Sequence, residues 1–289
     1  MSRIKSKSPV QISILIVTFN SASTINQCLD SIIRQSFSDY EILVFDNASG
    51  DATLKEISKY QNIKMFPCQN NIGFGAAMNK LAEKAGGEYL FMLNPDCVCP
   101  PETLIRLLDF ARAHPGAISP ALVYPDGDQQ LSARSFPGYK NILFSRRSPL
   151  FQLGLAKSGE AGYLFLDCAA KVPAVSATAL FIGNNLFKQS DGFDERFFMY
   201  LEDIDLCRRL AEKEIDIWYL PDVKISHVLG ASSASNAIKA SYHHHFSMFK
   251  YFTKHYPRNK IKNLILFLLL AAGLMVSVAT KVLKVKKRK

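Results

Sequence analysis

The feature that most constrains the fold is a regular alternation of apolar runs and amphipathic segments over the first 125 residues. Residues 12–19 form an apolar run rich in β-branched side chains, which is typical of a strand buried on both faces. The same alternation predicts further strands over residues 40–45, 63–66 and 89–93. It predicts helices over residues 23–35, 52–60, 75–85 and 101–114. This β-α-β-α order predicts an α/β fold with a mostly parallel, doubly wound central sheet flanked by helices.

The rest of the chain is less regular. Residues 125–171 are rich in Gly, Ser and Arg, and we interpret them as an irregular excursion or lid within one domain spanning residues 11–235. Beyond this segment regular patterning resumes over residues 172–182, and we expect a strand over residues 215–220, then a strand that reaches His227. An aromatic, His-rich helix should cover residues 236–260. Residues 1–10 form a basic leader, and residues 261–289 an apolar, basic tail.

The net charge of +10 is concentrated in that tail. Residues 1–249 hold 24 Lys/Arg and 25 Asp/Glu, whereas residues 250–289 hold 11 Lys/Arg and no acid. A nucleic-acid groove would need basic residues on a folded face, so this distribution disfavours a nucleic-acid partner. It favours contact with an anionic membrane surface. The six cysteines show neither a Cys-x-x-Cys pair nor a zinc spacing, and we expect reduced thiols in a cytoplasmic domain.

Residues 264–280 carry no charge, and seventeen residues lie at the lower limit for a membrane-spanning helix. Basic residues flank both ends of this run, whereas a single span should have its basic flank on one side. A re-entrant or surface-lying helix would satisfy both flanks, and so would a span whose lysines snorkel. The alternative is a buried core helix.

Polar clusters follow four successive predicted strands, at residues 18–20, 46–51, 70–75 and 94–96. In an open α/β sheet, ligands bind at the carboxyl ends of the strands. Asn and Asp also form turns at such positions, but four clusters in register favour a ligand site. No Gly-x-Gly-x-x-Gly or P-loop motif follows the first strand, which disfavours dinucleotide oxidoreductases and P-loop enzymes.

A second polar feature is the acidic segment that contains Glu202, Asp203 and Asp205. On a helix starting near residue 201, Asp203 shares a stripe with apolar residues three, four and seven positions later. We therefore expect Asp203 to point inward as a general base, since burying a charge without a task is costly. Asp205 should lie on the outer face within reach of Arg208 and Arg209. The alternative for Asp203 is a carboxylate that interacts with the helix dipole.

These motifs together resemble glycosyltransferase family 2, and within it the bacterial rhamnosyltransferase-like branch. The resemblance covers roughly residues 11–260 and rests on order and spacing. The matching segments are Val17-Thr18-Phe19-Asn20, Asp46-Asn47-Ala48-Ser49-x-Asp51, Asn71-x-Gly73-Phe74, Asn79, Leu93-Asn94-Pro95-Asp96, Gly192-Phe193-Asp194-Glu195-Arg196-Phe197-Phe198, Glu202-Asp203-x-Asp205-Leu206 and His227-x-x-Gly230-x-Ser232.

The resemblance implies a GT-A fold, a nucleotide-diphosphate sugar donor and a divalent cation, Mg²⁺ or Mn²⁺. It implies that Asp203 is the base and that Glu202 assists in placing the acceptor. The metal motif of the family corresponds to residues 94–96, so Asp96 would carry the metal, with His227 as a partner. One of the two acidic positions of that motif is Asn94 here. The donor-binding residues implied by the resemblance are Thr18, Asn20, Asp46, Asn47, Asp51, Asn71, Gly73, Asn79 and Asn94.

The leading hypothesis is thus an inverting glycosyltransferase at the cytoplasmic face of a bacterial membrane. It would move a sugar such as rhamnose to a lipid-linked or surface-polysaccharide acceptor. The alternatives are a transferase for another hexose or N-acetylhexosamine and a catalytically silent scaffold of a polysaccharide assembly complex. His227 as an ordinary strand-end residue also stays open, as does a homodimer.

Overall fold

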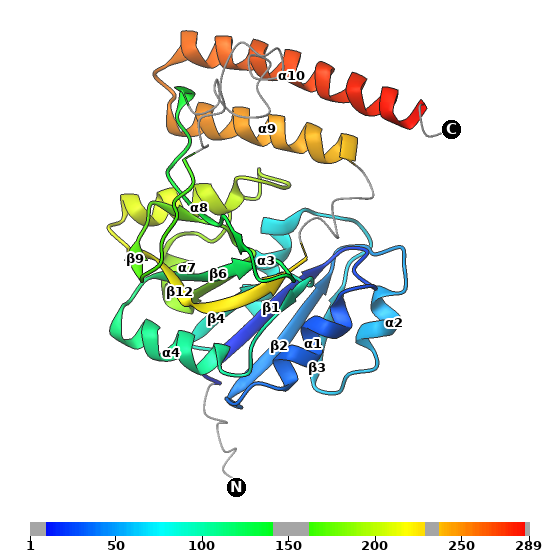
Figure 1. Ribbon diagram of the computed structural model, residues 1–289, viewed down its shortest axis with the longest axis vertical. Coiled ribbons are helices and arrows are strands. Elements are labelled where there is room, and N and C mark those ends of the chain that lie inside the picture. The colour runs from blue at the N-terminus through cyan, green and yellow to red at the C-terminus, as the bar shows by residue number, and fades with distance from the viewer. Residues whose placement is uncertain (1–9, 141–161, 229–236, 287–289) are drawn as a thin grey trace, which may run out of the picture.

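The computed structural model describes residues 10–140, 162–228 and 237–286. Its core is a mixed sheet with the strand order β3-β2-β1-β4-β11-β6-β12-β5 (Figure 1). β1, β2, β3 and β4 are mutually parallel, as the apolar runs predict. β11 runs antiparallel to both of its neighbours. The main strands are β1 (Ile12–Thr18), β2 (Tyr40–Asp46), β3 (Ile63–Pro67), β4 (Tyr89–Leu93), β5 (Cys97–Val98), β6 (Ala117–Val123), β11 (Ala179–Gly183) and β12 (Ile217–His227).

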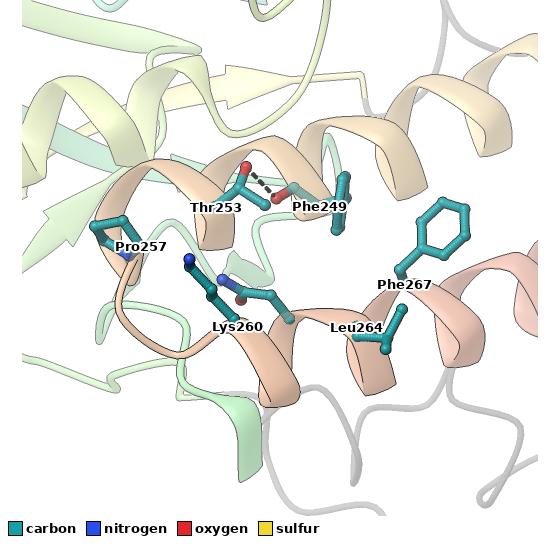
Figure 2. Close-up of a pocket in the computed structure, with 7 residues that line it drawn as sticks. Phe249, Thr253, Pro257, Lys260, Leu264 and Phe267 are labelled. Carbon is teal, nitrogen blue, oxygen red and sulfur yellow. Dashed lines mark hydrogen bonds between the residues drawn. The ribbon is translucent and has the colours of Figure 1, made fainter.

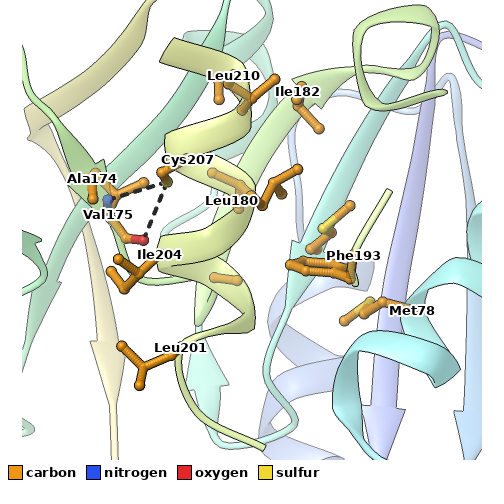
Figure 3. Packing of buried hydrophobic residues seen from close by; sticks show 14 of the residues in the cluster. Met78, Ala174, Val175, Leu180, Ile182, Phe193, Leu201, Ile204, Cys207 and Leu210 are labelled. Carbon is orange, nitrogen blue, oxygen red and sulfur yellow. Dashed lines mark hydrogen bonds between the residues drawn. The ribbon is translucent and has the colours of Figure 1, made fainter. Parts of the chain in front are cut away.

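Helices cover both faces of the sheet (Figure 1). One apolar core lies between the sheet and α1 (Ile25–Ile33), α2 (Thr53–Ile57) and α4 (Thr103–Ala113). A second core on the other face joins α3 (Phe74–Lys84), α7 (Asn184–Gln189) and α8 (Glu202–Glu212). Figure 3 shows part of this second core, where Cys207 and Leu210 of α8 pack against strand residues such as Leu180. Each helix buries one apolar stripe, as expected for a layered α/β domain.

The segment from 125 to 171 contributes short strands to the domain. β7 (Gln129–Gln130) pairs with β6, and β9 (Ala170–Lys171) pairs with β12. β8 (Ala133–Arg134) and β10 (Ala174–Val175) form a small two-stranded sheet. The described ends of the segment are therefore built into the domain, while residues 141–161 lie outside the described part of the chain.

Two local predictions were wrong. The strands expected over 215–220 and up to His227 form one continuous strand, β12, with an irregularity between Leu220 and Lys224. Helix α1 begins at Ile25 after Thr24, with no side-chain capping bond, so Ser23 is not its N-cap.

The chain ends in a helical hairpin. α9 (Ala237–His255) packs on the catalytic domain, and α10 (Lys260–Lys286) lies alongside α9 (Figure 1). Between them opens a groove of about 480 Å³, lined by Phe249, Thr253, Pro257, Lys260, Asn263, Leu264 and Phe267 (Figure 2). Within the described residues, Lys260–Ser277 is long and apolar enough to cross a membrane, with mean hydropathy 1.8, and 17% of it is buried. The tail is therefore not a buried core helix.

Candidate functional site

The first two parallel strands bring two polar loops together at their carboxyl ends. Thr18 lies opposite Asp46 in the strand register, and the Thr18 hydroxyl donates to the Asp46 carboxylate over 2.9 Å. Asp46 is buried and also accepts the hydroxyl of Ser49 at 2.6 Å. The Ser49 hydroxyl oxygen in turn accepts the backbone N–H of Asn20 at 2.9 Å. Thr18 and Asp46 therefore hold the two loops in one fixed arrangement.

Strained backbone occurs in both loops. Ala48 has φ 65°, in the left-handed region that costs an alanine about 1 kcal/mol or more, and Asn20 has φ 52° in the same region, which Asn adopts more readily. The side-chain oxygen of Asn20 accepts the N–H of Gly50 at 2.8 Å, which locks the conformation. The Asp51 carboxylate accepts the N–H groups of Ala22 and Thr53. Strain of this kind concentrates at ligand sites, where the surrounding contacts hold it.

The third loop is tied to the second by Asn47. Its amide donates to the Gly73 carbonyl at 3.2 Å, and its side-chain oxygen accepts the N–H of Ile72 at 2.8 Å. Asn71 accepts the N–H of Gly73 at 3.0 Å. Gly73 has φ 91° and ψ 164°, a conformation essentially restricted to glycine, and a Cβ there would lie 2.6 Å from the carbonyl oxygen of Phe198. Thr18, Asn20, Asp46, Asn47, Asp51, Asn71 and Gly73 are thus gathered at one edge of the sheet.

Asn79 lies apart from this group. Its amide donates to the Phe193 carbonyl at 2.9 Å and to Glu195 at 3.1 Å, and its oxygen accepts the Phe193 N–H at 2.8 Å. These bonds use both ends of the side chain to hold the loop before α8. Contact of Asn79 with a donor stays a prediction, and the contacts described here give it a structural role.

The turn after β4 brings Asp96 to His227. Asp96 Oδ1 and His227 Nε2 are 3.4 Å apart, and both side chains are buried. His227 Nδ1 lies 2.8 Å from the side-chain oxygen of Gln130. Because that oxygen can only accept, Nδ1 carries a proton, and Nε2 is the ring nitrogen that faces Asp96.

The Asp96–His227 pair fits a divalent cation. Asp96 Oδ1 is buried and has no hydrogen-bond partner within the described residues, which is costly unless a cation or another donor occupies the site. The Cys97 thiol lies within 4.8 Å of both ligand atoms. Burial raises the pKa of Cys97 well above its ordinary value, so the thiol stays protonated and is a poor ligand. The donor set is therefore carboxylate oxygen and imidazole nitrogen, which suits Mg²⁺ or Mn²⁺.

The acidic segment begins helix α8, after two residues with left-handed backbone. Tyr200 has φ 69° and Leu201 has φ 66°, so the chain turns sharply into the helix at Glu202. Asp203 is half-buried and turned toward the sheet, where its carboxylate lies 3.4 Å from the Ala177 N–H. Its other oxygen accepts the Ile204 N–H at 2.8 Å. Asp203 thus contacts the segment between β10 and β11, but it is the least buried of the three carboxylates, because Glu202 and Asp205 are both buried.

Burial dominates the ionisation of both carboxyls. It raises the pKa of Asp203 above its ordinary value, although N–H groups and the Arg134 charge partly offset this effect. Burial and the neighbouring Asp203 charge raise the pKa of Glu202 well above its ordinary value. One Glu202 oxygen is buried with no partner within the described residues. Burial thus raises the pKa of both carboxyls, more for Glu202 than for Asp203, and a carboxyl with a raised pKa suits general-base chemistry.

Two short segments connect Asp203 with the Asp96–His227 pair. Ala177 contacts Asp203, and the carbonyl of the next residue, Thr178, accepts the Asn94 N–H at 2.9 Å. On the other side, Gln130 bonds to His227, and Arg134 lies four residues further along the same segment. Short chain segments thus link Asp203 to the Asp96–His227 pair, and the roles of base and metal ligands stay predictions.

Sequence reasoning missed Gln130 and Arg134. The Arg134 Nε is buried with no hydrogen-bond partner within the described residues, and its guanidinium lies 5.2 Å from the Tyr163 ring centroid. Both residues fall in the irregular segment 125–171, whose pattern carries no period that would assign a direction to a side chain.

The expectation for Asp205 was wrong in part. Asp205 is fully buried rather than outward-facing, because α9 covers that side of α8. It accepts from Arg209 at 2.8 Å, His255 Nε2 at 2.7 Å and Lys254 at 2.6 Å. Arg208 instead donates to the hydroxyls of Tyr251 in α9 and Tyr256 just after it. Asp205 thus fastens the base-bearing helix to the terminal hairpin, and its structural role is confirmed.

Comparison with known proteins decides the family. Residues 13–166 match the family described as glycosyl transferase family 2. The chain belongs to this family. Among curated family members, it is 27% identical over 251 residues to an N-acetylglucosaminyl-diphospho-decaprenol L-rhamnosyltransferase of Mycobacterium tuberculosis, with 82% of each chain covered. It is 26% identical over 253 residues to the rhamnosyltransferase WbbL of Escherichia coli, covering 83% of this chain and 92% of WbbL.

Solved structures of glycosyltransferases share the fold. The mannosyltransferase PcManGT from Pyrobaculum calidifontis, solved with GDP-Man and Mn²⁺, is 18% identical with a TM-score of 0.59, covering 93% of this chain and 75% of PcManGT. Staphylococcus aureus TarS is 20% identical with a TM-score of 0.55, and the match covers 80% of this chain and 39% of TarS. The GT-A fold is therefore confirmed. As a member of glycosyl transferase family 2 close to rhamnosyltransferases, the protein is a glycosyltransferase.

Proposed function

We propose that this glycosyltransferase moves rhamnose, with inversion, from a nucleotide-diphosphate donor to a sugar on a lipid-linked acceptor. The observation that carries the proposal is the inward Asp203, whose raised pKa suits a base and which shares two connecting segments with the Asp96–His227 pair. By their names, both relatives above transfer rhamnose, and the Mycobacterium tuberculosis relative acts on an N-acetylglucosaminyl-diphospho-decaprenol. They supply the choice of sugar and acceptor class.

In this mechanism the loops around Asp46 and Asn47 hold the donor. Asp46 accepts three hydrogen bonds from protein groups, so it holds the loops together. The exposed parts of the Asn20, Asp51 and Asn71 side chains remain to contact the nucleoside and the sugar. Asn94, half-buried beside the metal pair, faces the same edge. Rigid loops of this kind place the anomeric carbon without further loss of entropy.

The chemical step is a single displacement. The acceptor hydroxyl transfers its proton to Asp203 as its oxygen bonds to the anomeric carbon, and the bond from that carbon to the diphosphate breaks. One attack by one activated oxygen inverts the anomeric centre. Asp96 and His227 would hold the Mg²⁺ or Mn²⁺, which when bound neutralises charge on the departing diphosphate. Arg134, a permanent cation that interacts electrostatically with Asp203, adds positive charge to the site.

The terminal hairpin supports a place at the cytoplasmic membrane face. α10 exposes apolar side chains along its length, including Ile261 at 77%, Leu264 at 61% and Met275 at 68%. Because α10 lies alongside α9 on the domain, these side chains favour a helix lying in the membrane surface with basic residues at both ends. Anionic lipids would then meet the basic flanks.

A donor panel tests this proposal. The full-length protein with Mn²⁺ would be offered nucleotide sugars, with transfer to a sugar-diphospho-lipid measured by mass spectrometry. We expect turnover with a nucleotide-linked rhamnose and inverted product stereochemistry by NMR. Faster turnover with another hexose or N-acetylhexosamine would replace the sugar assignment. Donor binding without hydrolysis or transfer for every donor would contradict the enzyme assignment and favour a silent scaffold.

A further inference from the structure

One buried side chain next to the Asp96–His227 pair takes no part in the proposed chemical step. Gln130 lies on β7 with 5% of its surface exposed. Its amide nitrogen donates to the backbone carbonyl of His227 at 2.7 Å and to that of Val123 at 3.3 Å. Its amide oxygen lies 2.8 Å from His227 Nδ1. One buried amide therefore contacts both the backbone and the ring of a residue that we propose as a cation ligand.

These contacts determine which end of the Gln130 amide faces the ring. Backbone carbonyls can only accept hydrogen bonds, so the amide nitrogen must face the carbonyls of His227 and Val123. Turning the amide over would bury its oxygen against two other acceptors and leave all of them unsatisfied. The amide oxygen is thus the end beside His227 Nδ1, and Nδ1 must donate to it. The other ring nitrogen, Nε2, then faces Asp96 Oδ1 at 3.4 Å.

Strand pairing fixes the backbone around the pair. Gln130 lies opposite Leu122 in the ladder of β7 and β6, and β6 pairs in turn with β12. His227 ends β12 and lies opposite Cys97, the residue after Asp96. A ladder does not fix the side-chain torsions or the tautomer of a histidine, and either ring nitrogen can bind a cation or carry a proton. The orientation of the ring therefore depends on the hydrogen bond that Nδ1 makes.

We propose that Gln130 is a positioning residue: it holds the His227 ring with Nε2 toward Asp96 and so keeps this nitrogen for a divalent cation. This inference rests on the proposed function and names a residue on which its cation site depends. A histidine that binds a metal usually donates its second ring N–H to an acceptor, and that bond fixes the ring and its tautomer. Without the Gln130 oxygen, the ring would be free to turn or to carry its proton on Nε2. The cation would then be left with Asp96 as its protein ligand.

The test measures the dissociation constant of Mn²⁺ in the full chain by EPR spectroscopy. Gln130→Met keeps the approximate size of the side chain and removes all of its hydrogen bonds. Gln130→Glu loses the bonds to the two carbonyls but keeps an oxygen that accepts from His227 Nδ1. The matched control is Gln129→Met on the same strand, where the amide donates to the Tyr219 hydroxyl at 2.7 Å instead.

Gln130→Met should raise the dissociation constant of Mn²⁺ about 10- to 100-fold, whereas Gln130→Glu and the control should stay within about threefold of the wild type. A purely structural role predicts equal losses of affinity for the two Gln130 variants, since both remove the same bonds to backbone carbonyls. Equal losses in these two variants, or unchanged binding by Gln130→Met, would therefore overturn the inference.

NMR of the metal-free protein, labelled with ¹⁵N in its histidine rings, gives a second readout that needs no cation. His227→Gln assigns the signals of His227. The wild-type ring should carry a proton on Nδ1, and Gln130→Met should divide that proton between the two ring nitrogens. A wild-type ring without a proton on Nδ1 would contradict the positioning role even if the variants failed to fold. A wild type that binds no Mn²⁺ but shows the Nδ1 proton would contradict the cation of the proposed function and still support the positioning of the ring.

Discussion

Replacing Asp205 by Asn should destabilise the protein by about 3 kcal/mol at neutral pH. Removing one partner from a buried ion network costs about 3–5 kcal/mol, because the opposite charges stay buried. Here the loss falls at the lower end. The loss is reduced because two cations retain other partners: Lys254 still pairs with Asp194 at 2.7 Å, and Arg209 still donates to the Gly192 carbonyl at 2.6 Å. An equilibrium constant of unfolding about 100-fold larger corresponds to this change.

The effect should depend on pH. Burial alone would raise the pKa of Asp205, but hydrogen bonds from His255, Lys254 and Arg209 outweigh it and hold the pKa below its ordinary value. A carboxyl with a lowered pKa stabilises the fold above its unfolded pKa of about 3.9, and this contribution is lost as the pH falls through the folded pKa. The difference between wild type and Asp205→Asn should therefore be smaller at pH 3 than at pH 7.

Urea unfolding followed by Trp218 fluorescence measures this difference, because Trp218 is the chain's single tryptophan and lies on β12. The full chain would be kept in a non-ionic detergent. Asp191→Asn is the matched control: Asp191 is 90% exposed at the side chain, and Asn tolerates its φ of 61°. The control should change the free energy of unfolding by less than about 0.5 kcal/mol. A loss below about 1 kcal/mol for Asp205→Asn at pH 7 would refute the role of Asp205.

Three further predictions follow from single sites. Gly73→Ala should lower the free energy of unfolding by about 2 kcal/mol or more and raise the donor KM, because the new Cβ would clash with the Phe198 carbonyl oxygen. Gly50→Ala is the control, because a Cβ at Gly50 has no close neighbour, and it should change both quantities little. In urea titrations, Glu202→Gln should stabilise the protein by about 1–2 kcal/mol at pH 8 but not at pH 4. Because the pKa of Glu202 is raised in the folded state, its carboxyl destabilises the fold as the pH rises above the unfolded pKa of about 4.3. Asp96→Asn should weaken Mn²⁺ binding about tenfold or more by calorimetry, with Asp126→Asn, in an exposed turn, as the unaffected control.

The sequence predicted the parallel half of the sheet, and the gathering of the polar loops at one of its edges, for a clear physical reason. Strands buried on both faces are apolar throughout, so 12–19 and 40–45 stand out, and the polar residues that follow them must lie at the carboxyl edge. The meeting of Asp96 and His227 needed the resemblance to a known family, because 130 residues of chain separate them. Local periodicity contains no information on that pairing.

The predictions from sequence were wrong or incomplete where packing between distant segments determined the position of a side chain. Asp205 was expected on the outer face because a helix was assumed to bury one stripe, yet α9 covers a second side of α8 and encloses the carboxylate. Arg134 and Gln130 lie in a segment without helical or strand period, so nothing in the pattern directed them to the site. Asn79 matched a family position, while its hydrogen bonds run to the Phe193 loop.

The central claim is that Asp203 removes the acceptor proton, and Asp203→Asn tests it most directly. Asn keeps the shape of the side chain and can still accept the Ile204 N–H, so the fold and donor binding should survive. Single-turnover transfer should fall about 10²- to 10⁴-fold, while the donor dissociation constant stays within about twofold. In the wild type, transfer should decline with falling pH at values above the ordinary range of an aspartate, since burial raises the pKa of Asp203. A variant that keeps more than about a tenth of the wild-type transfer rate would contradict the claim.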